Sequence, residues 1–200
     1  VHAPFHSDRR FAAHYRDSGK SARAQAFATM VEGMDRSLGD LRAHLVREGV
    51  AENTLILFVG DNGSDAPLGP AHAVACAAPL RGKKGAHYEG GMRVPFIAAW
   101  AEVAEGNPHQ MRLPIARGVL QKQQAAVYDL FPTILEAANV TPPIDYVTDG
   151  VRLQPLFSGQ PEKSRSQVFV MHYPHGPHRS NYFSCLRNGD WKVIYHYVPS

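Results

Sequence analysis

The residues best suited to chemistry follow a single hydrophobic run. That run, TLILFV at 54–59, is followed one residue later by the polar pair Asp61 and Asn62. Further along, Lys83 and Lys84 lie between two glycines in a Gly-rich basic stretch, LRGKKGAHYEGGMRVPF. Carboxylate and amide oxygens suit Ca²⁺ or Mg²⁺, and a glycine-flanked lysine lets the backbone approach an anion closely. A cation, an ammonium and a bound anion together indicate chemistry on a charged ester.

Each of these features also has a simpler explanation. Asp-Asn-Gly is a common turn after a strand, and two lysines on a loop are often just solvated. Tyr88, Glu89 and Arg93 could be catalytic, but a Glu–Arg pair that braces the Gly-Gly turn is the plainer interpretation. The residue types alone therefore leave a metal site and a structural turn as alternatives.

The elements around the polar pair are readable from periodicity. From Ala22 to Glu48 apolar residues recur at steps of three and four, which predicts a long amphipathic helix that ends at Gly49. The run Thr54–Val59 is almost wholly apolar, which predicts a strand buried on both faces, as in a parallel sheet. Such a sheet binds ligands at the carboxyl ends of its strands, where Asp61 lies.

The rest of the chain predicts a mixed architecture. A long loop covers Gly60–Arg93, a second strand Val94–Trp100, and a helix Val127–Ala138, in which Pro132 is tolerable if it falls in the first turn. Three short strands follow, at 166–171, 182–186 and 191–197, and Asn188-Gly189 signals a tight hairpin between the last two. We therefore expect an α/β fold with a small antiparallel sheet attached.

Composition narrows the class without choosing a function. The 200 residues are 44% hydrophobic and 20% charged, which is ordinary for a globular protein. A net charge of +3 with no block of basic residues argues against nucleic acid as a partner. No apolar stretch reaches the ~20 residues of a membrane span. Cys76 and Cys185 are far apart, so a zinc–thiolate site is not expected, while one disulfide stays open.

The stretch NTLILFVGDNGS, continued by LRGKKGAHYEGGMRVPFIAAW, closely resembles the sulfatase family of the alkaline-phosphatase-like superfamily. Four further segments agree in order: FATMVEGMDRSLGDLRAHL, YDLFPTILEAA, DGVRLQPLFSG and RNGDWKVIY. The resemblance implies the C-terminal part of an α/β/α sandwich at residues 1–158 and a small antiparallel β subdomain at 159–200. It also implies an exported, periplasmic or lysosomal protein.

The resemblance also implies roles for individual residues. Asp61 and Asn62 correspond to the second half of the family's divalent cation site, usually calcium, with magnesium possible. Lys84 corresponds to the lysine that contacts the sulfate, and Lys83 is the weaker candidate for a substrate contact. His2, in VHAPF, resembles the histidine that reaches the sulfate or the leaving-group oxygen.

Substrate and nucleophile follow from other segments. The stretch MHYPHGPHRSNYF, which contains His172 and His175, resembles a segment at the active-site rim and favours a sulfated carbohydrate over an aryl sulfate ester. Sulfatases make a formylglycine nucleophile in a Cys/Ser-x-Pro/Ala-x-Arg motif, and neither Cys76 nor Cys185 fits that motif. We therefore expect no nucleophile in this chain, no activity from it alone, and self-association or pairing with the N-terminal half of a sulfatase.

Three alternatives stay open at this stage. A phosphoric or phosphonic ester hydrolase of the same superfamily would share the metal chemistry and use Thr or Ser as nucleophile. A non-catalytic module could use the basic loop to hold anionic glycans. A structural α/β domain without a ligand is the third alternative.

Overall fold

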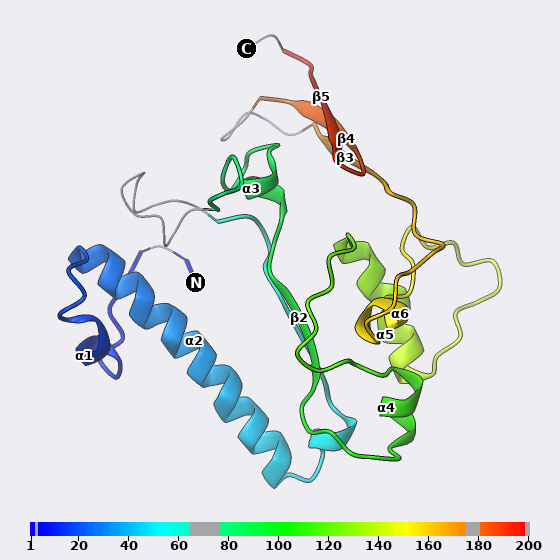
Figure 1. Ribbon diagram of the computed structural model, residues 1–200, viewed down its shortest axis with the longest axis horizontal. Helices are drawn as coiled ribbons and strands as arrows, with labels where there is room; N and C mark the ends of the chain where they lie inside the picture. The colour runs from blue at the N-terminus through cyan, green and yellow to red at the C-terminus, as the bar shows by residue number, and fades with distance from the viewer. Residues whose placement is uncertain (3, 65–76, 175–180, 199–200) are drawn as a thin grey trace.

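The computed structural model describes residues 1–2, 4–64, 77–174 and 181–198 (Figure 1). A long helix lies beside a central two-stranded ribbon, short helices cover the other side of the ribbon, and a three-stranded sheet forms the C-terminal end. In chain order the elements are α1 (Ala12–Tyr15), α2 (Ala22–Arg47), η1 (Ala51–Asn53), β1 (Leu55–Val59), α3 (Glu89–Met92), β2 (Phe96–Trp100), α4 (Pro108–Arg112), η3 (Val127–Asp129), α5 (Leu130–Ala138), α6 (Gln154–Phe157), β3 (Val168–Tyr173), β4 (Phe183–Asn188) and β5 (Trp191–His196).

The predicted long helix is confirmed as α2. Ser21 caps its first turn, since the Ser21 side chain accepts a hydrogen bond from the Ala24 N–H. The chain leaves the helix through Gly49, whose φ of 69° is a conformation that glycine adopts at little cost. Near the C-terminal end, Arg42 Nε donates to the Ala101 carbonyl at 2.6 Å and so joins α2 to the end of β2.

The central ribbon differs from the predicted parallel sheet. β1 pairs with β2 in antiparallel register, from Leu55 opposite Trp100 to Val59 opposite Phe96. In the described part of the connection, residues 60–64 and 77–95, the one helix is the short α3, and antiparallel strands need no long crossover helix between them. The prediction that β1 is buried on both faces was also wrong, because β1 is only half-buried and Ile97 on β2 is 60% exposed.

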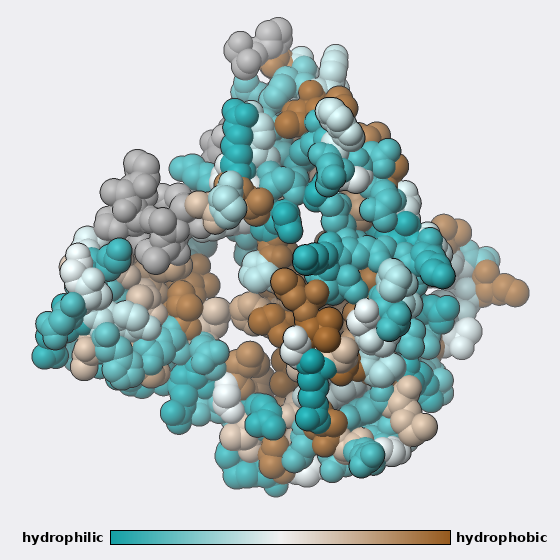
Figure 2. Space-filling model, in the orientation of Figure 1, coloured by the Kyte–Doolittle hydropathy of each residue, from teal (hydrophilic) through white to brown (hydrophobic). Residues whose placement is uncertain are grey.

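The covered face of the ribbon builds the main core. Trp100, Leu113 and Phe157 are buried there against side chains of β1, α5 and α6. Trp100 Nε1 donates to the Leu113 carbonyl at 3.0 Å, so the indole N–H keeps a partner inside the core. Figure 2 shows apolar side chains also lining the hollow between α2 and the ribbon. One face of the ribbon is therefore packed, and the face toward α2 is open.

A buried carboxylate joins three segments on the packed side. Asp129, at the end of η3, is fully buried and accepts hydrogen bonds from the Ala126 and Val151 backbone N–H groups. The Asp129 carboxylate also forms an ion pair with the guanidinium of Arg165, whose side chain is 5% exposed. The backbone of Asp129 also accepts from Thr133, which in turn accepts from the Leu153 N–H. Asp129 therefore fixes α5, the segment before α6 and the start of the C-terminal region together.

The predicted helix at Val127–Ala138 is confirmed as η3 followed by α5, with Pro132 in the first turn of α5. The C-terminal sheet is also confirmed, in the order β3-β4-β5 with both pairs antiparallel. Its hairpin loop is Gly189-Asp190, one residue later than predicted, because Asn188 pairs with Trp191. Gly189 has the positive φ, 56°, that the tight loop requires. The boundary proposed at residue 158 stays a prediction.

Within the described ranges, no helix is both long and apolar enough to cross a bilayer.

We expect Asp129→Asn to lower the free energy of unfolding by about 3 kcal/mol or more, because it leaves Arg165 buried without a counter-charge. Glu136→Gln is the matched control, since it removes the solvent-exposed Glu136–Arg152 pair and should cost less than about 1 kcal/mol. Urea denaturation of both variants measures the difference. Equal losses of unfolding free energy in the two variants would show that Asp129 does not hold these segments together.

Candidate functional site

Closely packed glycines bring the end of β1 against α3. The Gly63 N–H donates to the Gly91 carbonyl at 3.0 Å, and a Cβ on Gly63 would lie 2.1 Å from the Gly90 carbonyl oxygen. A Cβ on Gly91 would meet the carbonyl oxygens of Ala86 and Lys83 at 2.3 and 2.5 Å. These distances exclude any side chain unless the backbone shifts. The Gly-Gly pair is therefore needed for close approach of three backbone segments.

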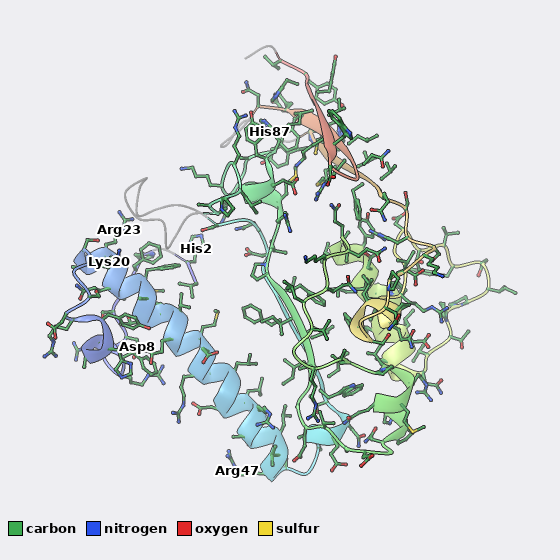
Figure 3. All side chains as sticks on the ribbon, in the orientation of Figure 1. His2, Asp8, Lys20, Arg23, Arg47 and His87 are labelled. Atoms are coloured by element: carbon green, nitrogen blue, oxygen red, sulfur yellow. The ribbon has the colours of Figure 1, made fainter. Side chains whose placement is uncertain are left out.

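The lysine loop is held by the same contacts. The Lys84 N–H donates to the Ser64 carbonyl at 2.9 Å, two residues beyond Asn62. The Lys84 ammonium in turn lies 3.4 Å from His2 Nε2, and His2 is labelled in Figure 3. The fold thus brings Lys84 and His2 together beside the residues that follow β1. Lys83, the weaker candidate, is exposed.

The proposed metal ligands lie at the start of this segment. Asp61 is exposed, and Asn62 uses its amide nitrogen to donate to the Gly63 carbonyl at 2.9 Å. A cation would therefore bind the amide oxygen of Asn62 and the carboxylate of Asp61. In the part of the chain that the structure describes, no three His, Cys, Asp or Glu side chains cluster as a metal site. The two oxygens fit Ca²⁺ in type but fall short of the 6–8 ligands that it takes.

An open hollow of about 540 Å³ adjoins Asn62, whereas Asp61, Lys84 and His2 are not among its lining residues. It is lined by Asn62, Ser64, Arg93 and the segments 77–80 and 94–95. Its volume lies within the range of small-molecule sites. The hollow therefore offers space for a ligand next to the proposed metal ligand Asn62.

The prediction that Glu89 pairs with Arg93 was wrong. Glu89 instead contacts two cations of the C-terminal sheet, with Arg187 Nη1 at 3.0 Å and Lys192 Nζ at 2.7 Å. Arg187 and Lys192 lie about a hundred positions along the chain, so no local spacing could have revealed them. The guanidinium of Arg81 lies 3.9 Å from the centre of the Tyr88 ring.

His87 is a second residue that sequence reasoning missed. Its ring, labelled in Figure 3, is buried between Phe183 and His196, with ring centres 5.2 and 4.7 Å away, and among the described residues neither of its nitrogens has a hydrogen-bond partner. Burial lowers the pKa of His87, and the nearby His196, Lys192 and Arg81 lower it further. The lowered pKa favours the neutral ring, which serves here as an aromatic contact.

The histidines proposed for substrate binding are only partly described. His172 Nδ1 lies 2.7 Å from Ser184 Oγ, which is 2.8 Å from the Tyr197 hydroxyl. His172 and Ser184 lie on the exposed face of the C-terminal sheet, opposite the face that carries His196. His175 lies outside the described residues, so the substrate role of both histidines stays a prediction.

Of the two cysteines, the structure describes only Cys185. Cys185 carries a free, buried thiol, and burial raises its pKa. Cys76 lies outside the described residues.

Comparison with known proteins identifies the family. The sulfatase family model matches residues 1–140. Steryl-sulfatase of Mus musculus is 32% identical over 192 residues, which are 92% of this chain and 28% of the mouse protein. N-acetylgalactosamine-6-sulfatase of Mus musculus is 34% identical over 161 residues, which are 80% of this chain and 27% of that protein. The chain belongs to the sulfatase family, and it spans about a quarter of the length of these relatives.

The fold agrees with this assignment. A protein solved in complex with its substrate D-glucosamine-2-N,6-O-disulfate superposes with a TM-score of 0.58 at 20% identity. The match covers 94% of this chain and 36% of that protein. The predicted fold class, an α/β fold of the alkaline-phosphatase-like type, is thereby confirmed.

We expect Gly63→Ala to lower the free energy of unfolding by about 2 kcal/mol or more, since the new methyl group has no room beside Gly90. Gly39→Ala is the control, because Gly39 lies in exposed α2 with no atom near its Cβ position, and it should stabilise by about 0.5–1 kcal/mol. Thermal and urea denaturation measure both. If Gly63→Ala unfolds like the unmutated chain, the close packing is not required.

Proposed function

We propose that this chain is the part of a sulfuric ester hydrolase that binds the divalent cation and the sulfate group. The observation that carries the proposal is the 3.4 Å contact between the Lys84 ammonium and His2, beside the segment that begins with Asp61 and Asn62. Membership of the sulfatase family supports it. An ammonium and an imidazole side by side form a site for the singly charged sulfate ester group.

Each residue has a distinct role in this proposal. Lys84 holds the sulfate and stabilises the charge that builds on its oxygens as the S–O bond breaks. His2 hydrogen-bonds the sulfate or gives a proton to the departing oxygen. Asp61 and Asn62 provide two oxygen ligands for Ca²⁺, with Mg²⁺ as the alternative ion. A bound cation would supply further stabilisation of the sulfate charge.

We assign the nucleophile to residues outside this chain. The sequence contains no Cys/Ser-x-Pro/Ala-x-Arg motif from which a formylglycine could form. Without a nucleophile no covalent step can occur, so the chain alone should not turn over sulfate esters. Pairing with another copy, or with the N-terminal half of a sulfatase, would also cover the open face of the ribbon around Ile97.

A sulfated carbohydrate is the proposed substrate class. One relative is named for N-acetylgalactosamine 6-sulfate, and the solved structure above holds a doubly sulfated glucosamine. The hollow beside Asn62 is large enough for a sugar ring. Lys83, His172 and His175 are the proposed additional substrate contacts. An aryl sulfate is the alternative, since arylsulfatase A of Homo sapiens is also a relative, at 31% identity.

Two further alternatives make different predictions. A phosphoric or phosphonic ester hydrolase would prefer the phosphate ester of the same alcohol. A non-catalytic glycan-binding module would bind anionic glycans equally well after Asp61→Ala, whereas a metal-dependent site would lose affinity.

We expect Lys84→Ala, made in the whole protein that carries this chain, to lower kcat/KM for a hexosamine 6-sulfate about 100-fold, because one preorganised charge on the transition state is lost. Lys83→Ala should have a smaller effect. Lys122→Ala removes an exposed lysine ahead of η3 and should leave kcat/KM unchanged.

Steady-state kinetics on the sulfate and on the matching phosphate ester measure these effects. A twofold or smaller effect of Lys84→Ala, or faster turnover of the phosphate, would contradict the proposal.

A further inference from the structure

We infer that Glu89 is a positioning residue for Lys84, through which the C-terminal sheet sets the geometry of the sulfate site. The inference rests on the proposed function, because it needs Lys84 to contact the substrate. Glu89 opens α3, and its carboxylate contacts Arg187 and Lys192 of the C-terminal sheet. Its effect passes through the backbone that it anchors.

The first link joins α3 to the sheet. Arg187 on β4 and Lys192 on β5 are direct cross-strand partners, and like charges in that arrangement repel. Glu89 lies between them and accepts from both, with the three side chains 26%, 19% and 14% exposed respectively. The carboxylate therefore neutralises a repulsion built into the sheet and fastens α3 to it.

Other contacts at the same face keep α3 in one register. Lys192 Nζ also lies 3.3 Å from Met92 Sδ, and Cys185 Sγ lies 4.0 Å from that sulfur. On the other side of Glu89, the buried ring of His87 packs against Phe183. His87, Glu89 and Met92 thus each contact the sheet.

The second link joins α3 to Lys84. The Gly90 N–H donates to the Arg81 carbonyl at 2.8 Å, and Gly91 is packed so closely that its Cβ position lies 2.5 Å from the Lys83 carbonyl. Lys84 itself is tied to Ser64 by its N–H. A shift of α3 must therefore move the backbone on which Lys84 stands. Small displacements of positioned groups cost large factors in rate.

The test is a double-mutant cycle in the whole protein that carries this chain. Glu89→Gln keeps the shape of the side chain and removes its charge, and we expect it to raise KM for a hexosamine 6-sulfate about tenfold. In a Lys84→Ala background the same change should have little further effect. Glu136→Gln is the matched control, because Glu136 is 28% exposed, pairs with one arginine and lies on α5. It should leave KM unchanged.

Each result bears on the inference. If Glu89→Gln behaves like Glu136→Gln, or keeps its full effect without Lys84, Glu89 does not act through Lys84. If Lys84→Ala alone has no effect, the proposed function itself fails, and the two failures are thereby distinguished. Should Glu89→Gln not fold, Arg187→Gln replaces it, since Lys192 still pairs with Glu89. That variant should raise KM in the same direction by a smaller factor.

Discussion

The candidate site depends on the close approach of backbone at Gly63, Gly90 and Gly91. Three segments meet there at distances that exclude a Cβ: the end of β1, the lysine loop and the first turn of α3. Glycine loses more conformational entropy on folding than other residues, so ordering these three glycines lowers the stability of the fold. The close packing of these glycines positions the polar and charged side chains of the candidate site. The metal-ligand candidates precede Gly63, and Lys84 is hydrogen-bonded to the residue that follows it.

Two charged anchors then attach the rest of the chain to this junction. Asp129 and Arg165 form a buried pair that fixes the helices on the packed face of the ribbon to the segment leading into β3. Glu89 fastens the completed sheet back onto α3. The C-terminal sheet, which follows the helices in the chain, therefore contacts α3 and, through it, the lysine loop near the end of β1. Residues far apart in the sequence thus together fix the backbone around α3 and the lysine loop.

The sequence revealed the parts that depend on local pattern. Apolar spacing located α2 and α5, and the Asn-Gly signal located the C-terminal hairpin to within one residue. The motifs in their order along the chain could be matched to a family because each motif is short and contiguous. Strand direction was misjudged, because an apolar run reads the same in a parallel and an antiparallel pair. The partners of Glu89 and the burial of His87 were not predictable, since both arise from contacts made about a hundred residues apart.

The central claim is that one cation and one sulfate group share the surface formed by Asp61, Asn62 and Lys84. X-ray diffraction from crystals of the whole protein, grown with Ca²⁺ and a sulfate ester that cannot be hydrolysed, tests it directly. The account predicts a cation on the oxygens of Asp61 and Asn62, about 2.3–2.6 Å away. It also predicts a sulfate oxygen within about 3 Å of Lys84 Nζ. A cation bound elsewhere, or a sulfate out of reach of Lys84, would contradict it.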